Sequence, residues 1–454
     1  MKLKYYHLFI LLALLISCEK DFLSIKSDKS LVVPATLQDF QALLNNADVM
    51  NVGMPNLGEI SADDYYLKYD TWNMLSQPKE KNGYIWAKDI YEGTNTFGDW
   101  IDRYQQVFYA NNVLEGLDKI KNIDDPKGSN EIKGSALFFR AYGFYQIAQI
   151  FCAPYSASSA NEGLGIPLRL KSDINLPSTR ATIKQTYAQI VSDLTESVHF
   201  LPSVVSYKTR PDKTASYAML SKVYLVMQDY DRSLLFADSA IMQPNHELID
   251  FNDIDLSASY PMQQYNSEVI FQSTLDYSSN FSASRINIDS SLFELYADND
   301  VRKVAWFRIT NGHLIFKGNY NGSSPFFFSG LGLDEAYLNK AECLSRIGKL
   351  EEAMNTLNTL LEKRFIAGTF TPLVASDTHK ALQLILQERR KELLLRGIRW
   401  SDLRRLNLDP TTSKTLYRAL NGHTYELKAN SLNYVLPIQD DVIRLSGISQ
   451  NPRN

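Results

Sequence analysis

The sequence predicts a mainly α-helical protein, in which a scaffold of tetratricopeptide-like helix pairs is combined with an irregular, loop-rich half. Three observations support this fold class. Apolar residues recur at steps of three and four in several long segments. Two of these segments share the spacing of a helix-pair repeat. The stretches between the helical segments are rich in Asn, Ser and Gly and contain only short strand-like runs.

Four helices are expected in the first half of the chain. The first, over residues 36–45, begins with the capping residue Thr36 and carries its apolar residues on one face. Three longer helices are expected over residues 99–121, 130–152 and 182–201. In the first of these three, Trp100 and Asn111 lie on the inner face. We expect Trp100 to belong to the core and Asn111 to be a buried structural hydrogen-bonding residue.

Two later segments repeat the spacing of a tetratricopeptide helix pair. The first contains Tyr217, Leu220, Ser221, Tyr224, Tyr230, Ser233, Ala237 and Ala240. The second contains Tyr337, Ala341, Leu344, Leu350, Ala353, Leu357 and Leu360, with Gly348 at its turn. Small residues at the repeat positions allow two antiparallel helices to approach closely. Each such unit exposes an apolar face that a neighbour must cover. A last long helix is expected over about 376–396.

The rest of the chain lacks helical periodicity. Residues 48–98 and 244–332 are expected to be irregular, and residues 153–180 and 409–436 to be loops. Insertions of this kind project from a helical scaffold and commonly carry binding residues. We therefore expect any ligand site to lie in this irregular half.

The N-terminus predicts a cleaved lipoprotein signal over residues 1–17. Lys2 and Lys4 precede an apolar run from Leu8 to Ile16, which is too short to span a bilayer. The run ends in Leu-Ile-Ser-Cys, which resembles a bacterial lipobox and makes Cys18 the expected lipidation site. An ordinary secretory signal is the alternative. If Cys18 is lipidated, residues 18–35 form a tether and the lipid anchors the protein to a membrane.

Composition and motifs exclude several function classes. The sequence pI of about 5.9 argues against a nucleic-acid partner, which would need a basic face. Phosphate-binding loops, nucleophile elbows and zinc-protease motifs do not occur in the sequence. We expect no enzymatic activity and no cofactor; a structural calcium ion is compatible with the sequence but not indicated by it. Cys152 and Cys343 are expected to be buried free thiols.

Several blocks in order resemble the SusD/RagB family. Residues 388–405, with Glu-Arg-Arg-Lys-Glu-Leu followed by Arg-Gly-Ile-Arg-Trp-Ser-Asp-Leu-Arg-Arg, are similar to the C-terminal signature of that family. Residues 337–343, 139–142, 434–438 and 450–452 resemble further family blocks. With the lipobox, the resemblance covers essentially the whole mature chain. It implies one SusD-like body over residues 18–454, with an N-terminal part at about 36–230 and a C-terminal part at about 231–454. It also implies four helix pairs, so two degenerate pairs are expected at 99–150 and 183–228.

The resemblance also implies a function. Members of this family are outer-membrane lipoproteins, exposed at the cell surface, that capture glycans without catalysis and pass them to a TonB-dependent, SusC-like transporter for import. Glu19-Lys20-Asp21 resembles an acidic signal for export to the cell surface; a generic charged tether is the alternative. Two alternative functions stay open: uptake of peptides or glycoprotein fragments by the same route, and a tetratricopeptide-type lipoprotein scaffold that binds partner proteins.

Exposed aromatic rings are the natural candidates for sugar binding, because their faces are apolar and their edges polar. Of the 53 aromatic residues, most lie on expected helix faces, and Trp86 and Trp400 are assigned to packing. The remaining candidates lie in the two irregular stretches in which the family places its ligand site. The expected ligand-binding residues are Asp64, Tyr66, Trp72, Trp306 and Tyr320.

Overall fold

The computed structural model describes residues 34–94, 98–323 and 325–454. The long helices are α7 (Ile101–Leu117), α8 (Pro126–Phe151), α9 (Ile183–Phe200), α10 (Lys213–Val226), α11 (Tyr230–Ile241), α14 (Leu333–Arg346), α15 (Leu350–Glu362) and α16 (Thr378–Glu392). Helices of up to eight residues are α2 (Leu37–Leu44), α3 (Ala47–Met50), α4 (Leu57–Ser61), α5 (Tyr69–Asn73), α6 (Pro78–Tyr84), α12 (Ser290–Phe293), α13 (Arg302–Ala305), α17 (Arg399–Leu406) and α18 (Asp440–Ser446). Three 3₁₀ turns complete the helical elements: η3 (Phe251–Asp253), η4 (Ser279–Phe281) and η5 (Leu432–Tyr434). The mainly helical fold class is confirmed.

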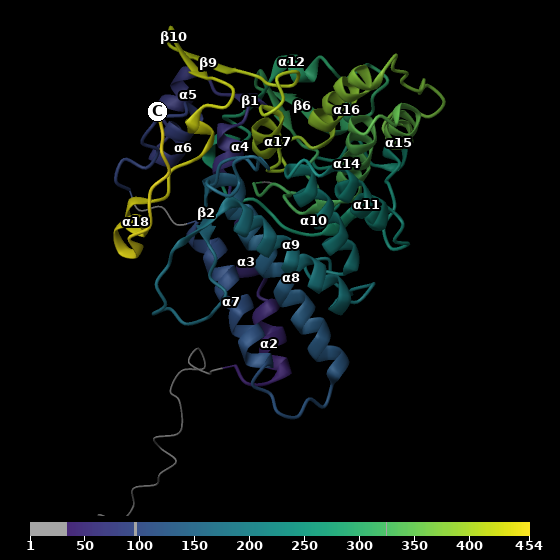
Figure 1. The fold of residues 1–454 in the computed structure, drawn as a ribbon. Helices are drawn as coiled ribbons and strands as arrows, with labels where there is room; N and C mark the ends of the chain where they lie inside the picture. The colour runs from purple at the N-terminus through teal and green to yellow at the C-terminus, as the bar shows by residue number, and fades with distance from the viewer. Residues whose placement is uncertain (1–33, 95–97, 324) are drawn as a thin grey trace, which may run out of the picture.

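The helix pairs form a continuous scaffold. Helix α7 packs on α8, α8 on α9, α10 on α11, and α11 on α14, which also contacts α15 and α16. Figure 1 shows α2, α7 and α8 forming an extended lower end, with α10, α11 and α14–α16 stacked beside and above them. Helices α10 and α11 meet at small residues, since the hydroxyl of Ser233 donates to the carbonyl of Ser221 at 2.9 Å. The expected repeat pairs at 217–240 and 337–360 are therefore present.

Local capping explains where these helices begin. Thr36 and Thr182 each form a capping box, in which the threonine hydroxyl accepts from the backbone three residues later and that residue's side chain bonds back. Asp212, Asp229 and Asp377 cap α10, α11 and α16 through their carboxylates. Each cap satisfies backbone N–H groups that the first helical turn leaves without a partner.

The irregular half is held by two-stranded antiparallel sheets. The strands are β1 (Tyr65–Tyr66), β2 (Leu164–Pro167), β3 (Arg180–Thr182), β4 (Val269–Phe271), β5 (Asn287–Ile288), β6 (Phe307–Thr310), β7 (His313–Phe316), β8 (Leu331–Gly332), β9 (Leu416–Leu420) and β10 (His423–Leu427). The pairs are β1–β5, β2–β3, β4–β8, β6–β7 and β9–β10. In β1–β5, Tyr65 faces Ile288, so this pair joins the N-terminal irregular stretch to the central one.

Two of the expected irregular stretches are more ordered than the sequence suggested. Residues 48–98 contain α4, α5 and α6, which are five to seven residues long. Such helices complete too few turns to produce a visible periodicity. Residues 409–436 contain the hairpin β9–β10, which Figure 1 shows at the upper left beside α5.

The core confirms most of the sequence-based packing assignments. Trp86, Trp100 and Trp400 are buried, and so are Cys152 and Cys343. The side-chain amide of Asn111 donates to the carbonyl of Arg169 at 2.8 Å, as expected of a structural residue. Within the described ranges, no helix combines the length and apolar character needed to cross a membrane.

Candidate functional site

A pocket of about 430 Å³ lies between the first irregular stretch and the β9–β10 hairpin. Its walls come from three distant parts of the sequence: Asp63 and residues 65–67 with Tyr84 and Trp86, then Asp289, and then residues 414–419. The pairing of β1 with β5 brings the first two parts together. The pocket thus lies in the irregular half, where the sequence placed the ligand site.

Strand alternation decides which side chains face the solvent here. Successive side chains of a strand point to opposite faces. Accordingly, Tyr65 is buried while Tyr66 is 43% exposed, and on β9 Arg418 is buried while Tyr417 is 64% exposed. The hairpin turns at Asn421 and Gly422, whose φ values of 48° and 78° match a type I′ turn. Tyr66 and Tyr417 are therefore the exposed rings of this pocket.

Arg418 lies at the base of the pocket in an aromatic cage. Its guanidinium carbon is 3.5 Å from the ring centroid of Tyr84 and 5.1 Å from that of Trp86. It donates to the carbonyl oxygens of Ile60 and Ala62, at 3.2 and 2.6 Å. Among the described residues, no carboxylate lies within ion-pair distance of it, so carbonyl dipoles and ring faces are its partners.

Paired charges form the opposite wall. Arg399 donates to both carboxylate oxygens of Asp63, at 2.6 and 3.1 Å, and the Nζ of Lys414 lies 2.7 Å from one of them. Burial alone would raise the pKa of Asp63, but Arg399, Arg390 and Lys414 hold it well below its usual range. Asp63 is therefore an anion at neutral pH that accepts hydrogen bonds and does not donate a proton.

The five sequence-predicted residues fall into different environments. Tyr66 lines the pocket. Trp72 is half-buried on α5, and its indole N–H donates to the carbonyl of Lys81 at 2.9 Å, while the Lys81 Nζ lies 4.8 Å from its ring centroid. It does not line the pocket, and its role in binding stays a prediction.

Asp64 requires a correction. It is 1% exposed, and its carboxylate accepts from the Nε of Arg390 at 2.7 Å. Burial raises the pKa of Asp64, which Arg390 and Arg399 counteract. A carboxylate enclosed in this way has no free face toward a ligand, so Asp64 supports the pocket wall from behind.

Trp306 and Tyr320 also require correction, because each is 1% exposed. Trp306 packs against Phe251, Tyr296 and Phe316. A methyl group on Gly318 would lie only 2.1 Å from its Cδ1 atom. Rings enclosed this closely cannot stack on a sugar, so both residues belong to the core. The sequence showed that they lie outside regular helices but did not show that the loops around them fold inward.

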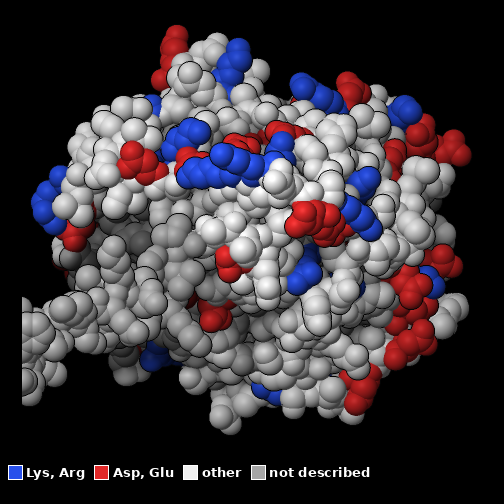
Figure 2. All heavy atoms as spheres, turned by 90° about the horizontal axis from the view of Figure 1, so that it is seen from below, with Lys and Arg blue, Asp and Glu red and all other residues white. Residues whose placement is uncertain are grey.

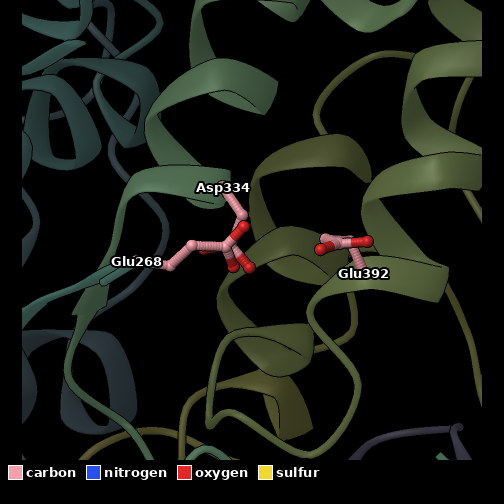
Figure 3. Close-up of side chains that lie close together, drawn as sticks. All are labelled: Glu268, Asp334 and Glu392. Carbon is pink, nitrogen blue, oxygen red and sulfur yellow. The ribbon is translucent and has the colours of Figure 1, made fainter. Parts of the chain in front are cut away.

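Tyr320 belongs to a buried network of charges. Figure 3 shows Glu268, Asp334 and Glu392 converging from three elements, and oxygen atoms of the three lie within 4.8 Å of one another. Such a group could hold a cation. Here Arg364 bonds Glu268 and Glu392 at 2.7 and 2.8 Å, and Arg396 bonds Asp334 at 2.7 Å. The hydroxyl of Tyr320 donates to Glu268 at 2.5 Å. The guanidinium groups supply the positive charge that a metal ion would bring.

Two other hollows differ from this pocket in their lining. One of about 630 Å³ is lined by polar groups such as Asn252 and Asn358, which already bond to neighbouring backbone atoms. Another of about 590 Å³, along α7 and α18, is lined mainly by apolar side chains including Ile101, Phe108 and Ile174. The pocket between Tyr66 and Tyr417 combines exposed rings with charged and polar groups.

The sequence reasoning missed Tyr417, Arg418 and Lys414. The signal was present: Asn421-Gly422 stands between two runs of alternating residues, which is typical of a two-residue hairpin. Reading that hairpin would have placed Tyr417 and Arg418 on opposite faces of one strand.

On the face seen in Figure 2, basic and acidic side chains lie together in small mixed groups, and uncharged surface lies between these groups. On this face, that distribution differs from the continuous basic face of a nucleic-acid-binding protein.

Cys18, the expected lipidation site, lies outside the described residues.

Helix pairs stacked into a scaffold, with a pocket of tyrosines and charged groups on an irregular half, define a helical-repeat binding protein. The comparisons give the family. A family model described as "Starch-binding associating with outer membrane" matches residues 21–225, and the SusD family model matches residues 333–453. The chain belongs to the SusD/RagB family.

Individual relatives are distant in sequence and close in fold. The SusD-like protein P2 of Formosa agariphila is 22% identical over 374 residues, which cover 68% of this chain and 71% of that protein. A SusD superfamily structure from Bacteroides thetaiotaomicron is 22% identical with a TM-score of 0.75, covering 92% of this chain and all of that one. A structure described as a laminarin binding SusD-like protein is 17% identical with a TM-score of 0.66, covering 91% and 97%.

Proposed function

We propose that this protein is a non-catalytic lipoprotein of the outer membrane that captures oligosaccharides at the cell surface, in the pocket between Tyr66 and Tyr417. One observation carries the proposal: in a member of the SusD/RagB family, two exposed tyrosine rings border a pocket that also offers charged hydrogen-bonding groups. The description of one related structure as laminarin binding supports a glycan as the ligand class.

The geometry suits a sugar chain. A pyranose ring presents C–H groups on its faces and hydroxyls at its edge, and a tyrosine ring offers an apolar face with a polar tip. Asp289 and Lys414 line the same pocket and can bond hydroxyl groups with charge-assisted strength. Stacking would hold the sugar ring, and the charged groups would select its orientation.

Binding without turnover fits the state of the pocket carboxylates. Glycoside hydrolysis needs a protonated carboxylic acid beside the scissile bond. The pKa of Asp63 is held well below its usual range, and Asp289 accepts from Arg390 at 3.1 Å. Asp63 is therefore an anion, and the carboxylate of each residue is already bonded to an arginine, which leaves the pocket poorly suited to acid catalysis.

Delivery and anchoring belong to the same proposal. The lipobox-like Cys18 would tether the protein to the outer membrane, and the ligand would pass to a TonB-dependent, SusC-like transporter. Family membership supports this route.

Peptides or glycoprotein fragments are the alternative cargo, since the charged groups of the pocket could also bond a peptide backbone. A purely scaffolding role is less well supported, because the exposed tyrosines lie on the irregular half and not on a repeat face.

Purified residues 19–454 on a glycan array, followed by calorimetric titration, test the proposal. Tyr417→Ala and Tyr66→Ala should each weaken oligosaccharide binding about tenfold, which corresponds to ~1.4 kcal/mol. Tyr207→Ala is the matched control, because Tyr207 is also 64% exposed and lies outside the pocket. Binding of peptides in place of glycans would favour the alternative cargo. Release of reducing ends by the pure protein, or unchanged affinity in both pocket variants, would refute the proposal.

A further inference from the structure

The pocket contains two cations that are weakly compensated by carboxylates: among the described residues Arg418 has no carboxylate within ion-pair distance, and Lys414 shares that of Asp63 with Arg399. Arg418 bonds only to backbone carbonyl oxygens and packs against aromatic faces. Lys414 is half-exposed, and the carboxylate that it contacts, on Asp63, already holds Arg399 in a two-pronged contact. Asp63 would keep that partner if Lys414 turned toward a ligand.

The unpaired guanidinium has a physical consequence. Removing a charge from water is costly unless an opposite charge compensates it. At Arg418 the described surroundings supply ring faces and carbonyl dipoles in place of a carboxylate, so the side chain keeps its net positive charge without an opposite charge beside it. The aromatic walls also exclude some water from around the cation, so its field in the pocket is screened less than that of a fully exposed charge.

The neighbouring acidic groups do not cancel this field. Asp64 and Asp289 are bonded to Arg390, and Asp63 is bonded to Arg399. Glu59 lies behind the wall, where burial and the nearby Asp64 raise its pKa to about 8, so it retains its proton at neutral pH. A further group of this region, Glu426, accepts from the Tyr417 hydroxyl at 3.3 Å, but it is exposed and solvent screens its charge.

We propose, resting on the proposed function, that this pocket selects glycans that carry an anionic group, with Lys414 contacting the anion and Arg418 attracting it from below. The anionic group is a carboxylate, as in a uronic acid, or a sulfate ester. Tyr66 and Tyr417 would stack on the sugar ring, and the charge would decide which sugars are accepted.

The test uses two matched pairs of glycans added to the array and titrations. One pair is tetragalacturonate and its carboxyl-reduced form, and the other is a carrageenan tetrasaccharide and its desulfated form. The charged member of at least one pair should bind about tenfold more tightly than its neutral partner, and the pair that responds distinguishes carboxylate from sulfate. Raising the salt from 0.05 to 0.5 M should reduce this preference, since screening lengths fall to several ångströms.

Substitutions in the pocket test which residues cause the preference for the charged glycan. Lys414→Gln should remove most of the advantage of the charged glycan, measured as the ratio of the affinities of the charged and neutral members of each pair. Lys428→Gln, at an exposed lysine just after the hairpin, is the matched control. Arg418→Lys keeps the charge and should keep the preference, whereas Arg418→Gln should lose it. Circular dichroism and the melting temperature establish that each variant is folded.

The experiment distinguishes failure of the anionic selection from failure of the proposed glycan capture. If the glycans bound on the array are all neutral, if both members of each pair bind equally, or if Lys414→Gln keeps the full preference, the anionic selection is refuted while glycan capture stands. If no glycan on the array is bound, the proposed function fails, and the inference fails with it.

Discussion

The Nε of Arg390 donates to the carboxylate of Asp64 at 2.7 Å, although 326 positions separate the two residues. The same guanidinium also donates to the carbonyl of Asp63 and to the carboxylate of Asp289. One side chain on α16 thus joins the two irregular stretches that form the pocket. Most charged residues of the basic C-terminal signature are enclosed here and paired with carboxylates, so this segment braces the irregular half from within.

Removing the Asp64 carboxylate should destabilise the fold strongly. Asp64→Ala would leave Arg390 buried with one of its charge partners missing, and breaking such a pair costs about 3 kcal/mol or more. Urea denaturation followed by tryptophan fluorescence measures the change. Asp441→Ala, which removes an exposed pair with Arg444, should cost less than about 1 kcal/mol. Equal effects of the two substitutions would contradict the bracing role.

Trp306 should matter for stability and not for ligand binding. Trp306→Ala would leave a large cavity beside Tyr296 and Phe316, at a cost of about 3–5 kcal/mol. Thermal denaturation should show the loss, while the folded protein at low temperature should bind glycans with unchanged affinity. A variant of normal stability that binds poorly would return Trp306 to the ligand site.

Glu59 should make stability fall as the pH rises from about 4.5 to about 8. Burial and the neighbouring Asp64 raise its pKa from about 4.5 when unfolded to about 8 when folded. The folded state therefore holds this proton more tightly, so the associated stability is complete below about pH 4.5 and lost as pH rises through 8. Glu59→Gln removes this contribution. Between pH 6 and 9 its melting temperature should fall less than that of the wild type, and parallel curves would disprove the assignment.

Trp72 should contribute less to binding than Tyr66. Its N–H and one side of its ring are already engaged by Lys81, and it lies outside the pocket lining. Trp72→Ala should therefore weaken glycan binding less than tenfold, as measured by the titration used for Tyr66→Ala. A larger loss in a folded variant would place a second aromatic contact on α5.

Lipidation of Cys18 can be tested in cells. Cys18→Ser should remove the thiol that would carry the acyl chains. The protein should then move from the membrane fraction to the soluble fraction and lose incorporation of radiolabelled palmitate. The buried Cys152 and Cys343 serve as controls, since substituting either by Ser leaves Cys18 in place. Continued membrane retention of Cys18→Ser would argue against the lipid anchor.

The long helices could be predicted from sequence because each repeats its apolar residues over several turns. The helix expected over 182–201 is α9 (Ile183–Phe200), including its Thr182 cap. Helix α17 (Arg399–Leu406) could not be predicted in this way, since its buried residues include Asp402, Arg404 and Arg405, and such residue types usually lie at the surface. Those residues are buried because each charge meets a partner from another element, and the partners are invisible in a single sequence.

The site could be predicted only in part, for a related reason. The exposure expected of Tyr66 is confirmed, whereas Trp306 and Tyr320 stand in a stretch of similar composition that folds inward. Composition does not decide between these outcomes. The deciding contacts, such as that of Tyr320 with Glu268, join residues 52 positions apart.

The pocket joins residues 63–67 to residues 414–419, and this sets its place in the order of synthesis. Because a ribosome releases the chain N-terminus first, the helices from α7 to α11 can pair as local neighbours while the hairpin is still unmade. The pocket is therefore complete only after residues 414–419 have emerged. A chain that stops before Lys414 can still build its scaffold, yet it lacks one wall of the pocket.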